Sequence, residues 1–241
     1  MSYCYRLYIL LFLLPLFALS QNQPSRSFGI RGGVNIGTPY TKPEPGSKGS
    51  LGIGPRLGLF LRLRVNDRFD LQFEALYSIK GGTYGTPVSG DTIYEQVLQG
   101  ITYHIPTFYK GYVEGKFYNR YIDFPMQARY HLSPRFNLMF GPQISYLLKG
   151  KNSGLADVDI GVSYSHVTDE PFDISDQINK WDYSFLFGGS YETFKGLSAD
   201  IGLSFGLRSI FKESANLVEG TVRNIYLQCS IGYRFGNHNV Q

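Results

Sequence analysis

Cysteine is scarce in this chain, which has 241 residues and only two cysteines, at positions 4 and 229. If the N-terminal segment that contains Cys4 is removed, Cys229 stands alone and no internal disulfide can form. A lone cysteine at an outward position of a strand usually behaves as a small hydrophobic residue. The sequence therefore excludes a fold that depends on disulfides.

Long apolar runs are also missing once the first twenty residues are set aside. No later segment has 18 uncharged apolar residues, so we expect no transmembrane helix. Residues 1–20 hold one basic residue (Arg6), an apolar run over 7–14, and Ala18-Leu19-Ser20. This pattern is typical of a signal peptide cleaved near Ser20, whereas a membrane anchor or buried helix would need a longer run. We expect residues 21–241 to form a single domain.

Charged residues make up only 17% of the chain, and the formal net charge is +4. The basic residues are spread through the sequence rather than clustered, which does not favour nucleic-acid binding. Aromatic residues and glycine are abundant instead, with 19 Tyr, 18 Phe and 28 Gly. This composition favours β-structure over helix.

Motifs that would carry chemistry are lacking. The four histidines, at positions 104, 131, 166 and 238, do not have the spacing of metal ligands, and the chain has no Gly-x-Ser-x-Gly elbow. Lipid-modifying barrel enzymes place a Ser and a His near the barrel rim, and Ser165-His166 is the only adjacent pair. We expect no cofactor, no metal site and no enzymatic activity.

What the sequence does have is alternation, seen best in residues 69–80. Odd positions are apolar, and even positions other than Leu76 are polar or charged, including Asp70, Glu74 and Lys80. A period of two predicts a β-strand. Twelve residues span roughly 40 Å, and a strand tilted by about 40° would rise roughly 30 Å, the hydrocarbon thickness of a bilayer. One face suits lipid and the other suits a polar interior.

Seven further segments repeat this alternation, namely 28–36, 56–64, 121–130, 136–149, 181–191, 197–208 and 224–235. The connections are alternately long and short, with short turns at 65–68, 132–135 and 193–196 and longer loops at 38–51, 81–115, 150–180 and 211–220. The sequence therefore predicts an all-β fold, an eight-stranded antiparallel up-and-down transmembrane β-barrel in a Gram-negative outer membrane. A soluble calycin-like barrel is the rival, but it would need apolar residues inside and polar ones outside.

Aromatic residues near the predicted strand ends would form the girdles at the membrane interfaces. These residues are Tyr77, Tyr130, Trp181, Tyr191 and Tyr233. Pro125 falls on the inward parity, where we expect it to cost a ladder hydrogen bond or to mark a bulge.

The inward charges are expected to share the lumen. An eight-stranded interior is just wide enough for side chains to fill, which predicts a packed ion-pair network that plugs the barrel. A proton or ion path through these groups is the alternative. The predicted members are Arg31, Arg56, Arg62, Arg64, Asp70, Glu74, Lys80, Asp123, Arg129, Glu192, Asp200 and Arg208.

The segment from 102 to 121 combines aromatic and basic residues within the predicted loops. Tyr and Arg are favoured at recognition surfaces, so this is a candidate surface for a protein partner. Its aromatic candidates are Tyr103, Phe108, Tyr109, Tyr112 and Tyr118. The alternative is that strands extend past the membrane and these rings pack against each other and the lipid headgroups.

Four further features stand out, namely residues 28–35, 71–82, 121–125 and Gly141-Pro142. Together they resemble the PorT-type outer-membrane β-barrel proteins of Bacteroidota. The resemblance spans the mature chain and implies a porin-like barrel. That family includes a member needed for type IX secretion and gliding, while most members are porin-like proteins without a known role. We therefore expect a structural or binding protein surrounded by outer-membrane lipid and lipopolysaccharide, with an accessory role in protein export or a lipid-modifying activity as alternatives.

Overall fold

Antiparallel strands account for nearly all of the described chain. The structure, a computed structural model, describes residues 26–40, 46–98, 101–161, 165–193, 195–212 and 222–235. The predicted signal peptide lies outside these residues. No helix in the described ranges is long and apolar enough to cross a membrane. The elements are β1 (Arg26–Tyr40), β2 (Lys48–Arg64), β3 (Phe69–Leu98), β4 (Ile101–His131), β5 (Phe136–Lys149), β6 (Asn152–Ile160), β7 (Ser165–Asp173), the 3-10 turn η1 (Ser175–Gln177), β8 (Trp181–Glu192), β9 (Leu197–Gly206) and β10 (Arg223–Arg234).

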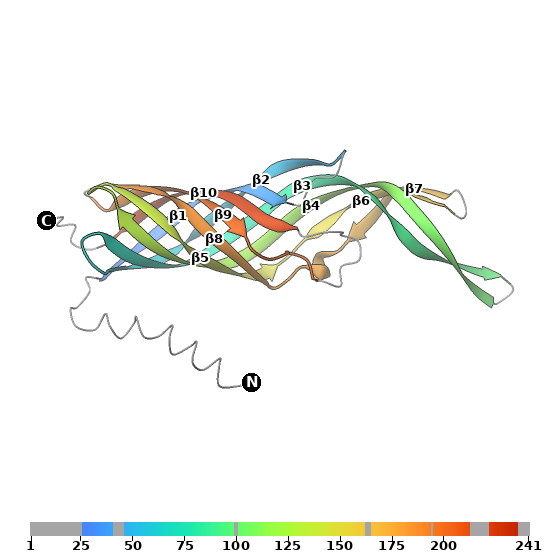
Figure 1. The fold of residues 1–241 in the computed structure, drawn as a ribbon, viewed down its shortest axis with the longest axis horizontal. Coiled ribbons are helices and arrows are strands. Elements are labelled where there is room, and N and C mark those ends of the chain that lie inside the picture. Colours follow the sequence, from blue (N-terminus) through green and yellow to red (C-terminus); the bar gives the residue numbers. More distant parts are fainter. Residues whose placement is uncertain are drawn as a thin grey trace, which may run out of the picture.

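Eight of these strands close into a ring (Figure 1). Its order is β1, β2, β3, β4, β5, β8, β9 and β10, and β10 pairs with β1 to complete the circle. Every neighbouring pair is antiparallel. The predicted eight-stranded up-and-down barrel is confirmed.

The strands are strongly staggered around the ring. Cross-strand partners can be followed once around the ring, starting from Arg26 of β1. This row of partners comes back to β1 at Ile36, which is ten residues further along the chain. Between these two residues the row passes through Leu63, Leu71, Ala128, Phe140, Phe187, Leu203 and Leu227. With usual strand spacings, this stagger corresponds to a tilt of about 40° from the barrel axis.

The two faces of the wall differ as the alternation predicts. On β3, Asp70, Gln72 and Glu74 are buried in the lumen. Large apolar side chains cover the outside, as shown by Leu57 and Phe187, which are 64% and 56% exposed. An apolar exterior around a polar interior is the arrangement expected of a strand wall in lipid.

Aromatic pairs mark both ends of the apolar exterior. Beside the short turns, Phe69 packs against Tyr130 and Phe136 against Tyr191, with ring centroids 5.0 Å apart in both pairs. Toward the other end, Tyr146 packs edge-on against Trp181 at 4.8 Å. Amphipathic rings prefer the headgroup level, so these pairs delimit the membrane-spanning part of the wall.

The three short turns all lie at one end of the barrel. In the first, the Asn66 side-chain oxygen accepts hydrogen bonds from the backbone N–H groups of Arg68 and Phe69, both 2.9 Å long. In the second, Ser133 Oγ accepts from the N–H of Phe136 at 3.1 Å. Side chains of this kind replace the backbone partners that a tight turn lacks.

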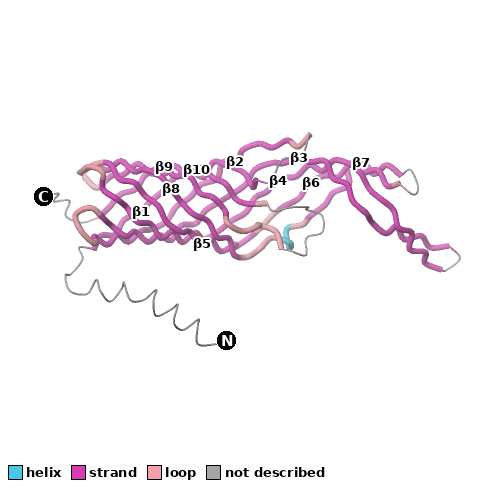
Figure 2. Tube along the Cα trace, in the orientation of Figure 1, coloured by secondary structure: helices cyan, strands magenta, loops and turns pink. Residues whose placement is uncertain are grey.

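The predicted loops at 81–115 and 150–180 are wrong as loops, because both segments contain strands. β3 and β4 continue as one long hairpin, and β6 and β7 add to the β4 side of it. Figure 2 shows strands running from the barrel into this projection. We call it the arm, and it consists of residues 48–51 of β2, 81–98 of β3, 101–118 of β4, β6 and β7.

Local packing explains why alternation did not reveal the arm. The ring of Tyr84 covers Gly115, and the ring of Tyr112 covers Gly85 on the other face. An aromatic ring over a cross-strand glycine stabilises strands without a run of apolar side chains. A sheet wetted on both faces carries no in-out pattern in its sequence.

A small apolar cluster lies where the barrel opens toward the arm. We call it the mouth cluster, and its members are Phe117, Ile174, Ile178, Ile210, Phe211 and Val222. An isolated bridge pairs Ile178 with Phe211, and Asn179 Nδ2 donates to the carbonyl oxygens of Ser209 at 3.0 Å and Phe211 at 2.7 Å. The connections beside β8 and β9 are therefore joined across the opening.

Pro125 is fully buried on the inward face of β4. The β3–β4 pairing stops at Phe73 and Met126 and resumes at Leu76 and Asp123 with no change of register. Proline has no backbone N–H to donate. The residue therefore interrupts the ladder without creating a bulge, the first of the two outcomes expected.

Candidate functional site

Two arginines that share one carboxylate cross the lumen. Arg31 of β1 contacts Glu74 of β3 at 2.5 Å and Asp200 of β9 at 2.8 Å. Arg129 of β4 contacts the other oxygen of Asp200 at 3.1 Å and also donates to Ser190 of β8. These bonds connect strands that are two or three places apart in the ring.

A second group lies closer to the turns. Glu192 accepts from Arg62 at 2.7 Å and from Arg234 at 3.1 Å. His131 lies 3.1 Å from Asp70 through its Nε2 atom, which forms an ion pair only when the imidazole is protonated. The last residues of β4, β8 and β10 are thereby tied to β2 and β3.

Phe60 separates two of the buried arginines. Its ring lies 5.5 Å from the guanidinium carbon of Arg31 and 5.6 Å from that of Arg62. The ring also covers Gly29, its cross-strand partner, where a β-carbon would come within 2.4 Å of it. An aromatic face attracts both cations and so reduces their mutual repulsion.

Toward the arm the lumen holds a third group. Lys80 donates to Asp123 at 2.9 Å and to Ser145 at 3.0 Å, and its ammonium lies 4.7 Å from the centre of the Tyr121 ring. Arg56 donates to Gln228 at 2.5 Å. Charges buried in this way are tolerated because they are paired or hydrogen-bonded.

Arg64 and Arg208 are exceptions among the predicted lumen residues, because the structure places both outside the lumen. Arg208 is exposed after the end of β9 and donates to Asn179 at 3.5 Å. Arg64 is at the end of β2, where it contacts the fully exposed Asp67 at 3.4 Å. Side chains alternate between inward and outward only while a strand is part of the barrel wall. Both residues lie at the point where their strand ends. The remaining predicted members are buried: Arg31, Arg56, Arg62, Asp70, Glu74, Lys80, Asp123, Arg129, Glu192 and Asp200.

Asp182 is a buried lumen carboxylate that the sequence analysis did not predict. It is 3% exposed and accepts a 2.7 Å hydrogen bond from Asn224. The signal was present, because Asp182 has the same parity on β8 as Ser184 and Glu192.

The aromatic candidates of residues 102–121 do not form one cluster. Phe108 and Tyr118 are 62% and 39% exposed, and the Tyr112 ring covers Gly85. Ten residues of strand separate Phe108 from Tyr118, a distance of roughly 33 Å. The side chains of Tyr103 and Tyr109 lie outside what the structure describes. The arrangement fits the alternative in which strands simply continue past the membrane.

The remaining candidates are Ser165 and His166, whose side chains lie outside what the structure describes. Ser165 and His166 begin β7 in the arm, where the backbone of His166 pairs with that of Asp159. Within the described ranges, no three His, Cys, Asp or Glu side chains are placed to hold a metal ion. What the described lumen offers chemically is a set of charges that are ion-paired or, as for Arg56 and Asp182, hydrogen-bonded to an amide side chain.

Comparison with known families decides the assignment. Residues 19–212 match the family described as outer membrane protein beta-barrel domain. The chain belongs to this family. It is therefore an outer membrane β-barrel protein, in agreement with the closed ring and its apolar exterior. No curated protein matches it in sequence.

Solved structures with a similar course of the chain are small and large outer membrane barrels. Ail of Yersinia pestis, solved in complex with the heparin analogue sucrose octasulfate, is 12% identical with a TM-score of 0.37, covering 89% of this chain and 100% of Ail. Neisserial surface protein A is 15% identical with a TM-score of 0.38, covering 88% and 99%. The translocator domain of autotransporter NalP from Neisseria meningitidis is 10% identical with a TM-score of 0.26, covering 96% of each chain.

Proposed function

We propose that this protein is a closed outer membrane barrel that acts through its arm rather than by conducting solutes. The observation that carries the proposal is the network of buried ion pairs across the lumen. Arg31, Glu74, Arg129 and Asp200 bridge β1, β3, β4 and β9 within hydrogen-bonding distance. A conducting path would have to separate charges that are already paired.

Further side chains support closure toward the arm. Tyr226 is buried and donates to the carbonyl oxygen of Gly81 at 3.1 Å. Beyond it lies the mouth cluster, in which Ile178, Ile210 and Phe211 are at most 5% exposed. An apolar constriction of this kind excludes water and ions by dewetting.

The arm is the part left to interact with other molecules. It extends the sheet beyond the wall and exposes Phe108 and Leu155, which are 62% and 49% exposed. Exposed apolar side chains on a projecting sheet are common at interaction surfaces. A structural or binding role follows. The proposal includes an accessory role in protein export, which the resemblance to the PorT-type proteins implies.

Planar-bilayer recording of the purified protein tests the closed lumen. We expect no steady ohmic current, because the paired charges and the mouth cluster leave no continuous water path. An open porin in the same bilayer serves as the positive control, and heat-modifiable migration on a gel shows that the inserted protein is folded. A steady current that scales with the amount of folded protein would contradict the proposal.

A further inference from the structure

Five exposed cations form an arc around one side of the barrel, at the end that carries the arm. We call this set the rim arc, and its members are Arg120, Lys149, Lys180, Arg208 and Arg223. They belong to β4, β5, β8, β9 and β10 or to the residues next to those strands. These five strands are consecutive neighbours in the ring.

Backbone pairing fixes the order of the arc. Arg120 and Lys149 are cross-strand partners, and the carbonyl oxygen of Lys180 accepts from Leu147 at 2.8 Å. Arg208 reaches Asn179, the residue before Lys180, and Arg223 lies against Gly206. With strands about 4.8 Å apart, the arc covers roughly 20 Å of the barrel surface.

Three of the five cations lie directly beside the apolar exterior. Leu148, Trp181 and Leu207 are the chain neighbours of Lys149, Lys180 and Arg208, and they are 52%, 45% and 61% exposed. At the ends of β5, β8 and β9 the surface therefore changes from apolar to cationic within one residue. Long basic side chains at this level extend toward the charged headgroups.

The cations of the arc have no carboxylate partner. No salt bridge joins any of the five to an acidic side chain among the residues that the structure describes. On the opposite side of the ring, the outer surface at this end shows Tyr40, Leu51 and Ile53 instead. The charge is thus concentrated on one side of the barrel.

We propose that the rim arc binds the phosphate groups of lipid A, the phosphorylated glycolipid anchor of lipopolysaccharide in the outer leaflet. Outer membrane barrels have their short turns on the periplasmic side, which places the arm end of this barrel at the outer leaflet. There the arc provides cations that have no carboxylate partner among the described residues, and the apolar wall below it accepts acyl chains. A surface roughly 20 Å wide suits a headgroup with several anionic groups rather than a single free phosphate. The inference rests on the outer membrane location and not on the closed lumen, so a conductance result would leave it untouched.

Lipid retention in nanodiscs tests the proposal. The protein is reconstituted in phosphatidylcholine discs containing diphosphoryl lipid A, and native mass spectrometry counts the lipid A that stays bound. The test variant is Lys149→Gln/Lys180→Gln/Arg223→Gln. Each cation near an anionic surface contributes about fivefold in affinity, so the triple variant should bind on the order of a hundredfold less.

The control removes equal charge at the other end of the barrel. Arg26→Gln/Arg68→Gln/Lys195→Gln changes three exposed cations beside the short turns and should retain lipid A like the unaltered protein. Dephosphorylated lipid A should bind neither variant strongly. If the rim variant fails to fold, Lys149→Arg/Lys180→Arg/Arg223→Lys, which keeps the charge, should fold and bind.

Three results would overturn the proposal. They are equal retention of dephosphorylated lipid A, an equal loss in the turn-end control, and displacement of lipid A by inorganic phosphate. The last result would identify a site for free anions instead of a lipid.

Discussion

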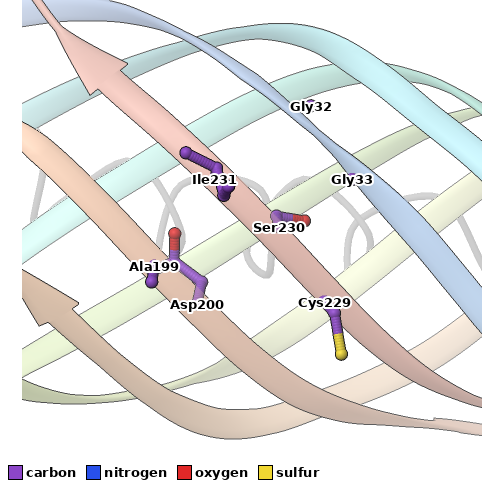
Figure 3. Close-up of a pocket in the computed structure, with 7 residues that line it drawn as sticks. All are labelled: Gly32, Gly33, Ala199, Asp200, Cys229, Ser230 and Ile231. Atoms are coloured by element: carbon purple, nitrogen blue, oxygen red, sulfur yellow. The ribbon is translucent and has the colours of Figure 1, made fainter.

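Two neighbouring glycines in β1 meet very different surroundings. A β-carbon added at Gly33 would come within 2.0 Å of the carbonyl oxygen of Cys229 and 2.6 Å of the Cα of Ser230. At Gly32 the nearest atom would be the end of the Leu57 side chain, at 3.4 Å. Figure 3 shows both glycines on the strand beside β10. They line a shallow depression of about 370 Å³ together with Ser230 and Ile231. β1 and β10 can approach closely only because residue 33 has no side chain.

Replacing Gly33 with alanine should therefore weaken the contact between the first and last strands. We expect Gly33→Ala to lower the free energy of unfolding by about 1–3 kcal/mol, the usual cost of overpacking. Urea titration in lipid vesicles, followed by tryptophan fluorescence, would measure it. Gly32→Ala is the matched control and should change stability by less than about 0.5 kcal/mol. Equal losses in the two variants would refute the steric argument.

Residue parity predicted most of the lumen side chains, and its limits are physical. Alternation assigns a side only while the backbone stays in the pleated wall, which is why Asp123 and Asp200 were placed correctly and Arg208 was not. Which acidic side chain pairs with which basic side chain in the lumen depends on the stagger of the strands around the ring. Arg31 and Asp200 are 169 positions apart, and only the closed ring brings them together.

At the scale of elements, the arm is where sequence and structure differ most. β3 and β4 are 30 and 31 residues long, about twice the length of β1 or β5. Their outer halves were predicted as loops because both faces of the arm are wet and rich in glycine. Backbone hydrogen bonds between the strands, rather than burial of side chains, stabilise these outer halves. Such hydrogen bonds do not produce a recognisable pattern in a single sequence.

The outer part of the β3–β4 hairpin, residues 90–109, should be dispensable for folding of the barrel. Ser89 and Lys110 are cross-strand partners, so residues 90–109 can be replaced by an Asn-Gly turn that suits a two-residue hairpin. We expect the shortened chain to insert into lipid and to keep its heat-modifiable migration, because no lumen contact is lost. Replacing residues 70–73 with Gly in a parallel variant removes wall residues and should abolish folding. Loss of folding in the shortened chain would show that the arm is part of the barrel core.

At the scale of the whole molecule, the barrel is defined by one closing contact. β10 pairs with β1 over twelve residue pairs, from Gly29 with Arg234 to Tyr40 with Arg223. The strand number and order followed from the alternation of long and short connections. The stagger of ten residues did not, since it depends on how the inward side chains pack together.

An engineered disulfide between β1 and β10 would show that these two strands are paired. Val34 is the cross-strand partner of Cys229, and paired residues have Cα atoms about 4.5–5.5 Å apart, within the range that a disulfide spans. We expect Val34→Cys to crosslink to Cys229 on mild oxidation, detected by mass spectrometry of the linked peptides. Ile36→Cys, whose partner is Leu227, is the control and should not crosslink. Equal crosslinking at positions 34 and 36 would contradict the register.

The pairing of the first strand with the last also governs how the protein can be made. Until residues 223–234 have been synthesised, β1 and β9 each keep an unpaired edge. Lipid offers no hydrogen-bond partner to such an edge, so a nascent or truncated chain cannot complete its assembly in the bilayer. A chain that lacks β10 would leave two unsatisfied strand edges facing lipid, so the closing strand is needed for a stable wall in the bilayer.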